Sequence, residues 1–111
     1  MIKKYGWVIL AAIGSISIAT IMSGSPLAAG TKEDAQNAGK GHYSLYCINC
    51  HGPNMVNIGT RSYDLRKFPL NDRPRFLTSV QEGKKDMPAW KDILTEEEIL
   101  EIWEYVKTRG R

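Results

Sequence analysis

The sequence predicts an all-α domain built from three main helices. Three stretches carry helix signals: residues 34–50, a stretch that starts after Asn71 or Asp72 and ends at Gly83, and a stretch that follows Thr95. No run of alternating apolar and polar residues indicates a strand, and no internal repeat is present. A chain of 111 residues has room for one small domain and not for two.

The N-terminal stretch differs from the rest and predicts a signal for export over residues 1–30. Lys3 and Lys4 provide a positive start, residues 7–22 carry no charge, and residues 23–30 are mostly small. These are the three parts of a secretory signal peptide. The alternative is an uncleaved membrane anchor, but the apolar run of 16 residues, 7–22, is shorter than the roughly 20 that span a bilayer.

The folded domain is therefore expected over residues 31–111, in the periplasm. Without Lys3 and Lys4, the 15 basic residues fall to 13, against 12 acidic ones. This weak balance argues against nucleic-acid binding, which needs a marked basic stripe. Basic residues gather within 61–85 and glutamates within 96–104. Solvated faces explain this segregation most simply; the functional alternative is a dipole that orients the molecule toward a partner.

The first helix is expected over residues 34–50, with Tyr43 and Tyr46 as candidates for burial. In the second helix either Asn71 or Asp72 can supply the cap. Pro74 suits the first turn of this helix, and the chain continues through Phe76, Leu77 and Val80.

The third helix has the clearest signals. Thr95 can cap it, and Glu98 three residues later completes a capping box. Further glutamates favour its positive end, while Lys107 and Arg109 favour its negative end. An apolar stripe at helical spacing predicts core contacts for Ile99, Ile102, Trp103 and Val106.

The chain has only two cysteines, in the motif Cys47-Ile-Asn-Cys50-His51. A disulfide between them would close a tiny loop and stabilise almost nothing. A structural zinc site needs four ligands in most cases. The other candidate ligand here is His42, so the fourth ligand would have to be a carboxylate. A thioredoxin-like redox pair would follow a strand, whereas the residues before Cys47 predict a helix.

The remaining explanation is covalent haem attachment, for which Cys-x-x-Cys-His is the signature. Cys47 and Cys50, one helical turn apart, can form thioethers with the two vinyl groups on one porphyrin edge. His51 can then bind the iron through Nε2. Haem attachment also suits an exported domain that is too small to be comfortably stable alone, because the ring adds a large apolar plate.

Met87 is the preferred second axial ligand of the iron. Met55 lies four residues after His51, too near to pass around the ring edge, and His42 is expected to be an exposed helical histidine. Met87 lies 36 residues after His51 in a predicted loop, and Pro88 restricts the backbone beside it. Thioether ligation raises the potential, and a six-coordinate iron leaves no site for a substrate, so the chain is expected to transfer electrons and not to be an enzyme.

Residues 52–70 contain Gly, Pro and Asn and are expected to form a loop around one haem edge. A backbone carbonyl in this loop should accept the Nδ1 proton of His51 and so orient the ring.

Together these features resemble the class I cytochrome c family over residues 39–107. Gly39 and Tyr43 precede Cys47 by eight and four residues, as in the Gly-x-x-x-aromatic-x-x-x-Cys helix of that family, and residues 102–106 resemble its final helix. The resemblance implies the class I cytochrome c fold around one covalent haem c. It also implies that Gly39 and Tyr43 pack against the last helix near Ile102 and Tyr105.

One departure concerns the proline whose carbonyl orients the histidine in mitochondrial-type members. Tyr63 occupies that spacing, so the hydrogen bond to His51 is expected to be made differently.

A finer resemblance rests on four segments: residues 63–69, 71–72, 75–76 and 87–90. They are similar to small periplasmic cytochromes that serve quinoprotein alcohol dehydrogenases, which use pyrroloquinoline quinone (PQQ). Four residues are then candidates for contacts with the haem propionates or for the docking face: Arg61, Arg66, Lys67 and Trp90.

The predicted function is electron transfer by a monomer, from a PQQ-dependent alcohol dehydrogenase to a terminal oxidase or another cytochrome. Cys47 and Cys50 would attach the haem, with His51 and Met87 on the iron. Two alternatives stay open: a haem enzyme with a labile Met ligand that acts on peroxide or a small gas, and a membrane-anchored cytochrome subunit of a larger respiratory complex.

Overall fold

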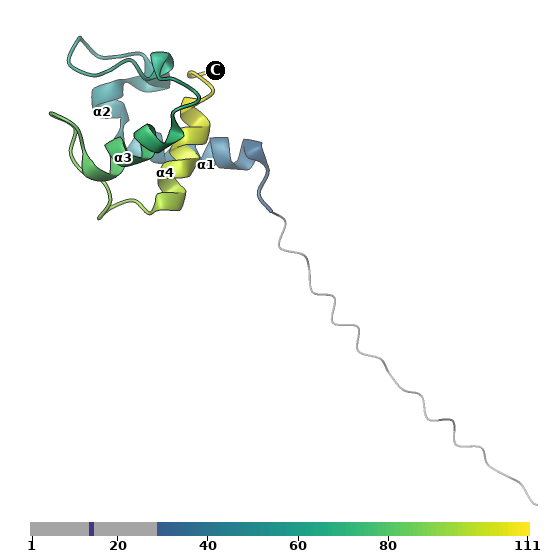
Figure 1. Cartoon of the computed structure of the whole chain (residues 1–111). Coiled ribbons are helices and arrows are strands. Elements are labelled where there is room, and N and C mark those ends of the chain that lie inside the picture. Colours follow the sequence, from purple (N-terminus) through teal and green to yellow (C-terminus); the bar gives the residue numbers. More distant parts are fainter. Residues whose placement is uncertain (1–13, 15–28) are drawn as a thin grey trace, which may run out of the picture.

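The computed structural model describes residue 14 and residues 29–111, so nearly all of the predicted signal segment lies outside the described residues. The described part consists of helices and loops with two short 3₁₀ turns (Figure 1). Its elements are α1 (Lys32–Tyr46), α2 (Ile48–His51), η1 (Pro53–Met55), η2 (Leu65–Lys67), α3 (Arg73–Glu82) and α4 (Glu96–Val106).

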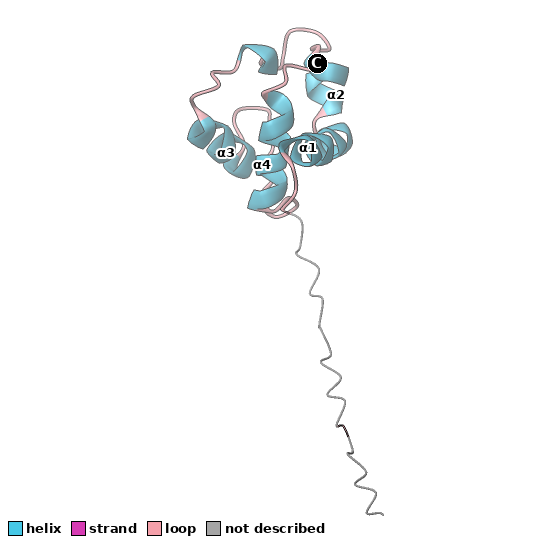
Figure 2. Ribbon diagram, turned by 90° about the vertical axis from the view of Figure 1, so that its right-hand side faces the viewer, coloured by secondary structure: helices cyan, strands magenta, loops and turns pink. Residues whose placement is uncertain are grey.

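The all-α prediction is confirmed for these residues. Figure 2 shows helices joined by loops, and the one extended pairing in the described chain is an isolated bridge between Lys84 and Met87. None of the described helices has the length and apolar character needed to cross a membrane.

Helix α1 starts two residues earlier than the sequence predicted, because a capping box at Thr31 begins it. The Thr31 hydroxyl accepts a hydrogen bond from the Asp34 amide at 3.1 Å, and the Asp34 carboxylate accepts one from the Thr31 amide at 2.7 Å. The predicted single helix to residue 50 is interrupted at Cys47, where φ is −108°. The hydrogen bonds nevertheless continue, since the His51 amide donates to the Cys47 carbonyl at 2.9 Å.

Helix α3 begins at the predicted place but without the predicted cap. Asp72 occupies the N-cap position and makes no side-chain capping bond. Its carboxylate instead lies 3.3 Å from Nε of Arg75, one turn further on. Pro74 does lie in the first turn, and the helix ends at Gly83 with φ of 75°.

Helix α4 confirms its predicted capping box and core stripe. The Thr95 hydroxyl accepts from the Glu98 amide at 3.2 Å, and the Glu98 carboxylate accepts from the Thr95 amide at 2.7 Å. The predicted apolar stripe is buried: Ile99, Ile102, Trp103 and Val106.

Helices α1 and α4 pack against each other at the expected residues (Figure 1). A Cβ on Gly39 would overlap the backbone carbonyl of Glu101 and would lie 2.9 Å from the Ile102 amide nitrogen. One turn on, the rings of Tyr43 and Tyr105 meet edge to face with centroids 5.2 Å apart. Close approach of the two backbones therefore depends on glycine at position 39.

An aromatic cluster joins α3 and α4 to the loop after η2. The ring centroids of Phe68 and Phe76 are 5.7 Å apart, and those of Phe76 and Trp103 are 5.0 Å apart. These three residues belong to the buried hydrophobic core.

Candidate functional site

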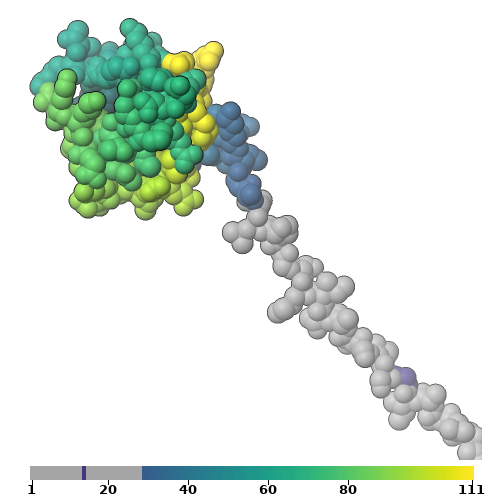
Figure 3. All heavy atoms as spheres, viewed as in Figure 1, coloured from purple at the N-terminus to yellow at the C-terminus, as the bar shows by residue number. Residues whose placement is uncertain are grey.

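A cavity of about 940 Å³ lies between α2, α3 and two loop regions, residues 58–65 and residues 84–90. All four predicted site residues line it: Cys47, Cys50, His51 and Met87. Its volume falls near the top of the range of about 300–1,000 Å³ for cofactor pockets. The space-filling view shows the surface hollowed between the teal and the light green segments (Figure 3).

The two cysteines reach this cavity from the short helix α2 and the residue before it. Cys47 is half-buried and Cys50 is exposed, and no disulfide joins them. Burial, with a smaller contribution from Cys50, raises the pKa of Cys47 to about 11. A redox-active Cys-x-x-Cys pair needs a thiol with a lowered pKa. The thiol of Cys47 therefore lacks the lowered pKa that the thioredoxin-like alternative needs in its reactive cysteine.

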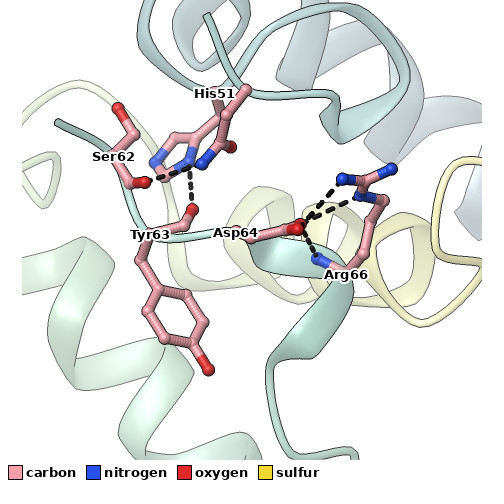
Figure 4. Close-up of polar contacts among 6 residues, drawn as sticks. His51, Ser62, Tyr63, Asp64 and Arg66 are labelled. Carbon is pink, nitrogen blue, oxygen red and sulfur yellow. Dashed lines mark hydrogen bonds and ion pairs between the residues drawn. The ribbon is translucent and has the colours of Figure 1, made fainter. Parts of the chain in front are cut away.

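His51 presents one ring nitrogen to the loop that follows it. Its Nδ1 lies 3.2 Å from the carbonyl oxygen of Tyr63, as Figure 4 shows. Burial lowers the pKa of His51, with the hydrogen bond to Tyr63 opposing that shift. A neutral ring that donates from Nδ1 keeps a lone pair on Nε2, which is the form of histidine that binds metals.

The expectation that this hydrogen bond would be made differently for lack of a proline was wrong. The carbonyl of Tyr63, the residue at the proline's spacing, is itself the acceptor. A main-chain carbonyl is present whatever side chain the residue carries, so the substitution leaves the acceptor in place. The prediction that a carbonyl between residues 52 and 70 orients His51 is confirmed.

Side chains that the sequence did not single out hold this loop segment against α2. The Ser62 hydroxyl donates to the Cys50 carbonyl at 2.8 Å, and the Asn57 amide donates to the Ser62 carbonyl at 2.7 Å. Next to them, Arg66 binds the Asp64 carboxylate through Nε at 3.0 Å and Nη2 at 2.9 Å (Figure 4). Only the folded loop brings Ser62 beside Cys50, so no local pattern could have revealed this contact.

Met87 lies in a tight turn that folds back onto the end of α3. Its amide and carbonyl each form a 3.0 Å hydrogen bond with Lys84, and the Trp90 amide donates to the Val80 carbonyl at 2.9 Å. Gly83 permits this approach: a Cβ there would lie 2.6 Å from the Met87 carbonyl oxygen. The predicted loop is present, and it brings Met87 half-buried to the cavity wall.

The other two candidate ligands lie away from the cavity. Met55 is fully buried in the hydrophobic core. His42 was expected to be exposed, but its side chain retains only 24% exposure and its Nε2 lies 3.2 Å from the Glu101 carboxylate. The reason is that α4 packs over this face of α1, which the sequence of α1 alone does not indicate.

The candidates for propionate contact or docking separate into two groups. Arg61 and Trp90 line the cavity, and the Trp90 ring centroid lies 5.5 Å from that of Tyr46. Arg66 and Lys67 do not line it. The wall also contains Arg75, which the sequence marked only as part of a resembling segment.

This donor set fits a covalently attached haem. Two thiols from one helical turn, one imidazole and one thioether from a distant loop face the same space. Apolar side chains such as Phe68, Phe76 and Val80 supply the rest of a wall suited to a flat aromatic ring.

Comparison with known proteins finds a matching family and several relatives. Residues 34–106 match the family described as "Cytochrome C oxidase, cbb3-type, subunit III". Cytochrome c6 of Gloeothece citriformis is 35% identical over 102 residues, covering 85% of this chain and 89% of the relative. Cytochrome c6 of Thermosynechococcus vestitus is 33% identical over 96 residues, covering 83% of each chain. A cytochrome c6-like protein of a Nostoc species is 32% identical over 68 residues, covering 58% of this chain and 61% of the relative.

Proposed function

Because the chain belongs to the class I c-type cytochromes, we propose that Cys47 and Cys50 attach its haem and that His51 and Met87 ligate the iron. As a member of this family the chain carries one covalently bound haem c and transfers electrons; it is not an enzyme. The proposal concerns which residues hold the group and which proteins exchange electrons with it.

One observation carries the ligand assignment: all four residues line a single cavity, although Met87 lies 36 residues beyond His51 in the sequence. His51 comes from α2 and Met87 from the turn after α3, so the two side chains approach from separate elements. The Tyr63 carbonyl accepts a hydrogen bond from Nδ1 of His51, which leaves Nε2 available to bind the metal.

Haem c supplies one-electron chemistry, and the chain tunes and shields it. The two cysteines would hold the haem, and the Tyr63 carbonyl orients His51. The Met87 thioether would favour the ferrous state and raise the potential. The apolar wall, including Phe68 and Phe76, would exclude water from the bound group and lower the local dielectric.

Replacement of Met87 by leucine tests the axial assignment, since leucine keeps the apolar volume and removes only the sulfur. We expect the far-red absorption band of a sulfur–iron bond to disappear and the potential to fall. Met55→Leu makes the same change in the core, away from the cavity, and should leave both unchanged. A Met87→Leu protein with the original band and potential would falsify the assignment.

As electron donor we propose a periplasmic PQQ-dependent alcohol dehydrogenase. The support is the resemblance of residues 63–69 and 87–90 to cytochromes that serve such enzymes, together with the position of Tyr63, Met87 and Trp90 at the cavity wall. The acceptor would be a terminal oxidase or another cytochrome. Mixing the ferric protein with each reduced quinoprotein dehydrogenase of its host tests the donor, which is wrong if none reduces it.

We also propose that residues 1–30 direct export and are removed, which leaves a periplasmic monomer. The support is the charge and size pattern of that segment. N-terminal sequencing of the mature protein checks this, because retention of residues 7–22 would indicate the anchored form instead.

A further inference from the structure

We propose that Arg75 binds a propionate carboxylate of the haem, with Phe68 and Asp72 positioning its guanidinium group. The inference rests on the proposed function, because it requires haem in the cavity lined by Cys47 and His51.

Arg75 is held in place at the cavity wall on two sides. It projects from α3 and lines the cavity. Its Cζ lies 4.5 Å from the centroid of the Phe68 ring, in cation–π geometry. Its Nε lies 3.3 Å from the Asp72 carboxylate. With these two contacts, the guanidinium group of Arg75 has less conformational freedom than that of a typical surface arginine.

These contacts leave donors for a second carboxylate. A guanidinium has five N–H groups in a rigid fork, and Asp72 engages the Nε edge. Within the described chain, Asp72 is the one carboxylate that forms an ion pair with Arg75. The terminal nitrogens can therefore bind a further carboxylate in the bidentate manner that guanidinium groups favour.

Haem brings two carboxylates into the cavity on its propionate chains, which leave the ring on the side away from the vinyl groups. Thioethers to Cys47 and Cys50 would place the vinyl edge at α2. Figure 2 shows α3, the helix that contains Arg75, on the left of the domain and α2 at its upper right. A carboxylate beside Phe68 and Phe76 needs a cationic partner to offset its loss of hydration.

The other basic residues are less suited to this task. Arg61 lines the cavity, but its side chain is 85% exposed and it pairs with Asp86 at 3.3 Å. Lys84 and Lys85 are exposed on the Met87 turn. Arg66, a candidate from the sequence, is engaged with the Asp64 carboxylate and does not line the cavity.

The test measures the haem potential of Arg75→Gln as a function of pH. An ionised propionate stabilises ferric iron, so its protonation raises the potential. A neighbouring guanidinium lowers the pKa of a carboxyl by about 1–3 units. In the variant, the rise of the potential on acidification should therefore begin at least about one pH unit higher than in the original protein.

Arg73→Gln is the matched control: it removes the same charge from the same helix at an exposed position that does not line the cavity. Arg73→Gln should leave the pH dependence of the potential unchanged. Equal shifts in Arg75→Gln and Arg73→Gln would overturn the proposal, as would a shift produced only by Arg61→Gln.

If Arg75→Gln does not accumulate with haem, the comparison of Arg75→Lys with Arg73→Lys decides. Lysine keeps the charge but loses the bidentate fork. The pH at which the potential rises should therefore shift upward by a smaller amount in Arg75→Lys and not in Arg73→Lys. If the two lysine variants behave alike, the proposal is overturned. Failure of the original protein to contain haem would instead overturn the proposed function.

Discussion

The Nδ1 atom of His51 lies 3.2 Å from the backbone carbonyl oxygen of Tyr63, 12 residues further along the chain. Because the acceptor belongs to the main chain, the position of the loop sets the orientation of the ring, and the Tyr63 side chain does not. The loop position depends in turn on the hydrogen bond from the Ser62 hydroxyl to the Cys50 carbonyl.

Ser62→Ala should therefore raise the potential of the haem. Loosening the Tyr63 carbonyl weakens the hydrogen bond that makes His51 electron-rich, and a less electron-rich ligand stabilises ferric iron less. The expected rise is at most about 40 mV, the one-electron equivalent of about 1 kcal/mol. Ser44→Ala removes a similar 2.8 Å bond, to the Lys40 carbonyl in α1, and should leave the potential unchanged in the same redox titration.

Gly83→Ala should weaken Met87 ligation. The position combines φ of 75° with a Cβ that would lie 2.6 Å from the Met87 carbonyl oxygen. Strain of about 1–3 kcal/mol would displace the turn that carries the thioether. The sulfur–iron absorption band, followed on heating, should be lost at a lower temperature than in the original protein. Gly59→Ala shares a positive φ of 81° but its Cβ would meet nothing within 4 Å, so it should lower the transition temperature less than Gly83→Ala does.

Gly39→Ala should destabilise the packing of α1 on α4. The new Cβ would overlap the Glu101 carbonyl, and overpacking of this kind costs about 1–3 kcal/mol. Urea denaturation of the haem-containing protein should show a lower midpoint. Gly41→Ala, on the exposed face of the same helix with nothing within 4 Å, should instead stabilise by about 0.5–1 kcal/mol. Equal midpoints for the two variants would contradict the close contact.

The α4 capping box should make stability depend on pH in the acidic range. Hydrogen bonds from the Thr95 backbone and side chain lower the pKa of Glu98 below its ordinary value of 4.5. A carboxyl whose pKa is lower in the folded state stabilises the fold above about pH 4.5, and this contribution is lost as the pH falls through the folded pKa. Glu98→Gln should be less stable than the original protein at neutral pH, with the difference shrinking toward pH 3 in thermal melts.

The local signals in the chain were strong enough to predict several elements. The capping box at Thr95 and the stripe through Ile102 and Val106 located α4. The contact of Gly39 and Tyr43 with α4 was implied by the resemblance to the class I cytochrome c family, and the structure has it. The interruption at Cys47 was missed, because it changes the backbone angles of one residue without ending the hydrogen bonds. His42 was placed wrongly because its environment belongs to α4 and not to its own helix.

The sequence by itself determined the helical class of the domain and the chemistry of its motif. Capping residues, apolar spacing and the motif from Cys47 to His51 each involve a few neighbouring positions, so they can be recognised from the sequence alone. Only the tertiary structure decided that the Tyr63 carbonyl meets His51, that Met87 shares a cavity with Cys47, and that Arg75 lies on its wall. These relationships join residues from separate elements, and the packing of α1, α3 and α4 sets their distances, which no local pattern encodes.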